Sequence, residues 1–131
     1  MAGSINLTDP KDKEVEVIPA DVVMVFFSPM FSPTKARSNV VYDGVIWAFR
    51  ETTKQAVAQL EKHIKLLKLT FAEGGSDVLN RDVWVNIAKI HRVNAAEKGG
   101  AVLKLNGQQG TLTVVETKEY VDAAVKQPAV A

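Results

Sequence analysis

The chain has 131 residues, no cysteine, 16 basic and 15 acidic residues, and a formal net charge of +1. This composition excludes disulfides and thiolate metal sites, and it lacks the strong charge imbalance of a highly basic or acidic protein. The longest purely apolar run, 22–27, is far too short to span a bilayer, and the N-terminus lacks a signal-peptide pattern. We therefore expect a soluble protein in the cytoplasm.

The order of structural signals occurs twice along the chain. The segment 13–25 reappears as 81–93, and smaller signals repeat at offsets of 62 to 68 residues. Such a repeat indicates a duplicated fold, and a unit of roughly 60 residues buries too little surface to be stable alone. We therefore expect two repeat units, 1–65 and 66–131, packed on each other as a pseudo-dimer.

The first unit opens with three expected strands. Residues 5–8 and 14–17 flank a polar segment that begins with Asp9-Pro10, which predicts two strands joined by a hairpin turn. The next segment, 22–27, is apolar at every position. A strand without a polar face is buried on both sides, so we expect it inside the molecule.

A hairpin and a helix complete this unit. Asp43-Gly44 supplies the positive φ that a two-residue turn requires, which predicts strands at 40–42 and 45–49. Beyond them the apolar residues fall at helical spacing, and Thr52 with Gln55 forms a capping box. We expect one helix to close the unit.

The second unit repeats this order, with a looser first turn at 71–80, an Asn106-Gly107 hairpin, a helix that begins near Thr117 and a short C-terminal tail. The predicted fold class is therefore α+β, mainly β. Each of the two repeated units is predicted to be an antiparallel five-stranded meander followed by one helix.

The two units differ at residues 28–39, where the first unit carries the longer loop. This loop holds two Ser-Pro steps, an apolar pair and two cations. Exposed apolar side chains on a stiffened loop suit insertion into a partner's groove, which predicts a partner-contact loop. Its contact residues would be Met30, Phe31, Lys35 and Arg37. The alternative is that Met30 and Phe31 fold back onto the molecule's own core.

Catalytic signals are missing from the sequence. There is no phosphate-binding Walker motif, no Gly-x-Ser-x-Gly elbow, no His-Glu-x-x-His motif and no cysteine nucleophile. His63 and His91 have no close carboxylate or second histidine at metal-ligand spacing. We expect no enzymatic activity, no catalytic residues, no metal and no cofactor.

Nucleic-acid binding is the alternative to a protein-contact role. Residues 1–61 carry 6 basic and 8 acidic residues, net −2, whereas 62–131 carry 10 basic and 7 acidic residues, net +3. Small sheets with aromatic and basic residues on an open face bind single strands by stacking and phosphate contact. The candidate face in the second unit comprises Trp84, Lys89, His91 and Lys104. The competing interpretation is that these lysines only solvate a sheet face.

The chain also resembles a known family at several places. In the second unit these are 83–90, Asn106-Gly107 with 111–114, and Glu116-Thr117; in the first they are 5–9, 42–44 and 50–52. With these elements the unit resembles the FlbD-type small flagellar proteins and short uncharacterised phage and bacterial proteins. The resemblance implies a small non-enzymatic accessory or structural module, and it transfers no site residues.

The function that these observations predict is a non-enzymatic structural or assembly protein acting through protein–protein contacts. A phage virion component or the subunit of a homo-oligomer or larger assembly would fit, located in the cytoplasm or, if phage-encoded, in the virion. The alternative is a small single-stranded nucleic-acid-binding or regulatory protein that uses the basic face of the second unit.

Overall fold

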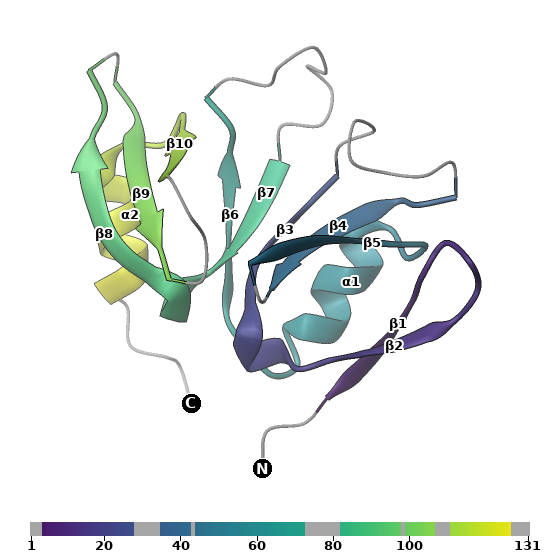
Figure 1. Cartoon of the computed structure of the whole chain (residues 1–131). Helices are drawn as coiled ribbons and strands as arrows, with labels where there is room; N and C mark the ends of the chain where they lie inside the picture. Colours follow the sequence, from purple (N-terminus) through teal and green to yellow (C-terminus); the bar gives the residue numbers. More distant parts are fainter. Residues whose placement is uncertain are drawn as a thin grey trace.

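A computed structural model describes residues 4–27, 35–42, 44–72, 82–97, 99–106 and 111–126. In these ranges the chain forms three antiparallel sheets and two α-helices (Figure 1). The predicted class, α+β and mainly β, is confirmed.

The first sheet is a hairpin of β1, Ile5–Thr8, and β2, Glu14–Val17. Its turn is closed by Asp9, whose carboxylate accepts hydrogen bonds from the backbone N–H groups of Lys11 and Lys13, at 2.8 and 2.9 Å. An aspartate that accepts bonds from the backbone two residues on is a common turn device.

The second sheet is the centre of the fold, with the strand order β5-β4-β3-β7-β6. Its strands are β3, Val22–Phe26; β4, Ser38–Tyr42; β5, Val45–Phe49; β6, Leu66–Thr70; and β7, Asp82–Asn86. Every residue of β3 and β4 is buried, which agrees with the prediction for the apolar run at 22–27.

The third sheet has the order β10-β9-β8, with β8 at Ile90–Ala95, β9 at Ala101–Leu105 and β10 at Thr111–Val114. The helices are α1, Thr53–Leu60, and α2, Lys118–Lys126. The predicted capping box of Thr52 and Gln55 is present at the start of α1.

Two hydrophobic clusters lie on opposite faces of the central sheet. The first contains side chains from β1, β2 and α1, with Phe49 and Leu60 fully buried in it. The second contains side chains from β9, β10 and α2, with Leu103 and Val121 fully buried. Figure 1 shows α1 on the side of the β1–β2 hairpin, and β8–β10 with α2 at the other end of the molecule.

The predicted pair of separate five-stranded meanders is not confirmed. Five strands and one helix do follow each other in each half of the chain, but β6 and β7 share a sheet with β3, β4 and β5. The physical reason lies in β3, which pairs with β4 along one edge and with β7 along the other. The division at residues 65 and 66 falls just before β6 and stays a prediction.

Within the described ranges, no helix is long and apolar enough to cross a membrane.

Candidate nucleic-acid interface

A β-bulge in β8 decides which side chains reach solvent from the third sheet. Ile90 stands opposite Leu105, but Arg92 stands opposite Lys104, so β8 carries one extra residue, His91, at this point. Without it Arg92 would stand opposite Leu103, a fully buried core residue. A bulge reverses the alternation of side chains beyond it, and here it turns Arg92 toward solvent.

The bulge creates a row of three exposed polar side chains across the sheet. Lys104 on β9 is the direct partner of Arg92 on β8 and of Thr111 on β10, and all three residues are exposed. Directly opposite residues share a face, with Cβ atoms about 5 Å apart. We call Arg92, Lys104 and Thr111 the cationic row.

No acidic residue lies on β8, β9 or β10. Among the described residues, the ion pairs are Arg50–Asp12, Lys68–Asp82 and Lys118–Asp122, so neither cation of the row has a carboxylate partner. Like charges placed directly opposite each other destabilise a sheet. The row therefore concentrates positive charge that no carboxylate of the described residues neutralises by an ion pair.

The structure separates the four residues of the predicted nucleic-acid face. His91 and Lys104 lie on β8 and β9 and are exposed. Lys89 is half-buried in a short 3₁₀ helix, Ile87–Lys89, and its carbonyl accepts a bond from Asn106 N–H at 2.8 Å.

Trp84 lies in the central sheet instead. It is half-buried on β7 and packs against the cluster that contains α1. Lys68, its partner on β6, places Nζ 5.8 Å from the Trp84 ring centroid and also pairs with Asp82 at 3.8 Å. A half-buried ring with its own cation is a poor stacking platform for a base.

The predicted partner-contact loop is described only at its end. Met30 and Phe31 lie outside the described residues. Lys35 and Arg37 are exposed, and the backbone N–H of Arg37 donates to the Phe49 carbonyl at 2.7 Å. Ser38 already belongs to β4 and is buried.

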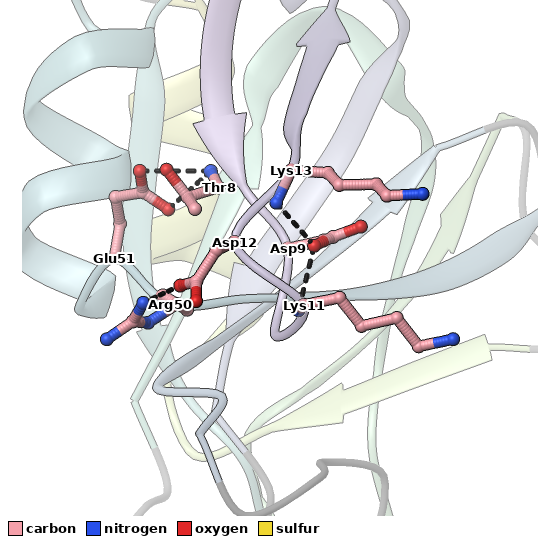
Figure 2. Close-up of polar contacts among 7 residues, drawn as sticks. All are labelled: Thr8, Asp9, Lys11, Asp12, Lys13, Arg50 and Glu51. Atoms are coloured by element: carbon pink, nitrogen blue, oxygen red, sulfur yellow. Dashed lines mark hydrogen bonds and ion pairs between the residues drawn. The ribbon is translucent and has the colours of Figure 1, made fainter.

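A second group of cations surrounds the β1–β2 turn. Figure 2 shows Arg50 directed toward Asp12, with which it forms an ion pair, whereas the side chains of Lys11 and Lys13 point away from these contacts. Acidic residues are interleaved with the cations here, at Asp9 and Asp12. This turn is therefore a weaker anion-binding surface than the cationic row.

Arg92 is the residue that sequence reasoning missed. Strict alternation along the strand groups Lys89 with His91 and places Arg92 on the core face. The available signal was the spacing of Ile90 and Val93, two apolar residues three apart in a strand, because only a bulge allows both to face the core.

A search for similar solved structures found the LytTr DNA-binding domain of a response regulator from Bacillus cereus. It superposes with a TM-score of 0.59, is 12% identical in sequence, and the similarity covers 94% of both chains. No family model matches the sequence, and no curated protein matches it. At this identity the similarity shows a shared fold.

This similarity corrects two predictions. The resemblance to FlbD-type flagellar proteins and to phage proteins was wrong, because the fold is that of a LytTr DNA-binding domain. The prediction of a structural, assembly or virion protein was wrong for the same reason, and an oligomer has no support. The physical cause is that the quoted motifs were hairpin turns and helix starts, which occur in unrelated folds.

Proposed function

We propose that this chain is a DNA-binding module of a regulatory protein, without enzymatic activity. The observation that carries the proposal is the third sheet, which presents Arg92 and Lys104 side by side and holds no acidic residue. The shared fold with a LytTr DNA-binding domain supports it. Unpaired cations on an open surface bind the phosphate backbone, which supplies most of the non-specific affinity of DNA-binding proteins.

The exposed side chains favour duplex DNA over single strands. On the outer face of the third sheet, the cationic row is followed by Asn94, Val102 and Thr113, so beyond the His91 imidazole at the bulge β8–β10 carry no Phe, Tyr or Trp ring. Proteins that bind single strands need such rings, because the unstacked bases stack on them. Trp47 is exposed at 38%, but it lies on β5 and stacks on Tyr42, with ring centroids 5.2 Å apart.

Binding of a short DNA duplex and of one of its single strands, followed by fluorescence anisotropy, tests this proposal. We expect the duplex to bind more tightly, with a Kd of roughly 10⁻⁶ to 10⁻⁴ M for a non-specific sequence at physiological salt. Tighter binding of the single strand would favour the single-strand alternative. Failure to bind either form at low salt would remove the proposed function.

We also retain the division into repeat units 1–65 and 66–131 as a proposal. It is supported by the bulge in β3, where Val22 stands opposite Tyr42 and Met24 opposite Val41, because the bulge in β8 has the same register pattern. A cytoplasmic location, where a DNA-binding module would meet its ligand, belongs to the same proposal.

A further inference from the structure

We propose that the cationic row, Arg92, Lys104 and Thr111, is a binding site for one phosphate group of the DNA backbone. This inference rests on the proposed function and deepens it, because it assigns the contact to three side chains on three neighbouring strands.

The chemistry of the row suits a phosphate. The Arg92 guanidinium offers donors in a planar fork, the Lys104 ammonium offers a compact charge, and the Thr111 hydroxyl adds a neutral donor. All three extend from one line across the sheet, with Lys104 in the middle. Charge-assisted hydrogen bonds to phosphate are among the strongest hydrogen bonds that proteins form. An anion bound between two cations also offsets the repulsion between them.

The first half of the chain provides an internal comparison. The bulge in β3 precedes a row in which Met24 stands opposite Val41, and Val41 opposite Ile46. Met24 and Val41 are 5% and 3% exposed, because they pack in the same cluster as Leu103 and Leu105 of the third sheet, whereas Ile46 on the edge strand β5 is 43% exposed. The first two positions of this row therefore carry apolar side chains that the protein covers.

The row in the second half has no such cover, since its three residues are exposed. Solubility alone would be served by acidic and basic residues opposite each other, an arrangement that stabilises a sheet. The chain instead places two cations opposite each other, which weakens the free sheet. Binding of an anionic ligand explains why two cations stand opposite each other here, whereas exposure to solvent alone does not.

Substitutions of Lys104 test whether DNA binding depends on this site or on exposed cations elsewhere in the chain. Lys104→Gln removes the central charge, Lys104→Arg keeps it, and Lys11→Gln removes an exposed charge from the β1–β2 turn as the matched control. We expect Lys104→Gln to bind duplex DNA about five- to tenfold more weakly at low salt. The slope of log K against log salt should fall by about one. Lys104→Arg and Lys11→Gln should bind like the unmodified chain.

Thermal unfolding provides a readout that does not depend on DNA. Inorganic phosphate should raise the Tm of the unmodified chain above its value in chloride of the same ionic strength, because a ligand stabilises the state that binds it. Lys104→Gln should lose this rise, and its Tm in chloride should equal or exceed that of the unmodified chain, since the repulsion with Arg92 is relieved. Arg92→Gln is a second variant with the same expectation.

The outcomes distinguish the two proposals. If the unmodified chain binds duplex DNA and both Gln variants at the row bind equally well, the phosphate site is wrong while the function stands. If inorganic phosphate raises the Tm through Lys104 but no DNA binds, the row binds phosphate but not the DNA backbone, and both the assignment to DNA and the proposed function fail. If neither ligand has an effect, both proposals are overturned.

Discussion

The backbone N–H of Thr8 donates one hydrogen bond that is shared between the two carboxylate oxygens of Glu51, at 2.8 and 3.0 Å (Figure 2). This contact ties the end of β1 to the start of α1. Glu116 does the same for Thr70 at the end of β6, accepting from its N–H at 2.8 Å and from its hydroxyl at 3.0 Å. Both carboxylates are therefore structural, and each joins a first strand to the segment before a helix.

Replacing either glutamate by alanine should destabilise the fold by about 1–3 kcal/mol, because a partly buried N–H loses a charged acceptor. The Gln variants should lose less, since an amide oxygen still accepts one bond. Glu14→Ala, on the exposed side of β2, is the control. Urea unfolding measures all of them, and a loss at Glu51 without a loss at Glu116 would contradict the equivalence of the two contacts.

The turn between β8 and β9 contains two glycines with positive φ, Gly99 at 83° and Gly100 at 84°. A Cβ at Gly99 meets nothing within 4 Å, whereas one at Gly100 would collide with the Val114 carbonyl oxygen. We expect Gly99→Ala to lower the free energy of unfolding by about 1–2 kcal/mol, which is the cost of holding a residue with a Cβ at positive φ. Gly100→Ala should cost clearly more, and equal losses of Tm would argue against this packing.

Asn86 is the buried polar residue that links β7 to β3. Its side-chain amide donates to the Val22 carbonyl at 2.8 Å, and its oxygen accepts from Ala88 N–H at 3.1 Å. Asn86→Ala should cost about 1–3 kcal/mol, because it leaves the Val22 carbonyl and the Ala88 N–H without this partner.

Asn86→Asp makes the same contact dependent on pH. Burial next to a carbonyl should raise the pKa of the new carboxyl above its ordinary value of about 3.9. Between that value and the raised pKa the unfolded chain releases the proton that the folded chain keeps, so stability falls as pH rises. Denaturation at several pH values checks this, and a constant difference from the unmodified chain would refute it.

Features that depend on residues close together in the chain could be predicted from the sequence, whereas the pairing of distant strands could not. The capping box at Thr52 and the strands at 5–8 and 14–17 depend on residues close in the chain, and they were predicted correctly. The pairing of β3 with β7 joins Met24 to Val85, which lie far apart in sequence. An apolar strand shows that both its faces are covered, but not which strand lies at its edge.

Strand pairing decides which residues of the predicted nucleic-acid face lie together. Lys104 and His91 are exposed on one sheet, whereas Trp84 belongs to another sheet and Arg92 was not among the predicted residues. The bulge before Arg92 and the sheet to which Trp84 belongs both depend on pairing partners, which the pattern of a single strand does not reveal.

The central claim is that DNA contacts the outer face of the third sheet. Chemical-shift changes in the NMR spectrum of the chain, recorded during titration with a short DNA duplex, test it most directly. We expect the largest changes at the amides of Arg92, Lys104 and Thr111, with little change at Lys11 and Lys13. Changes confined to the β1–β2 turn, or none at any duplex concentration, would contradict it.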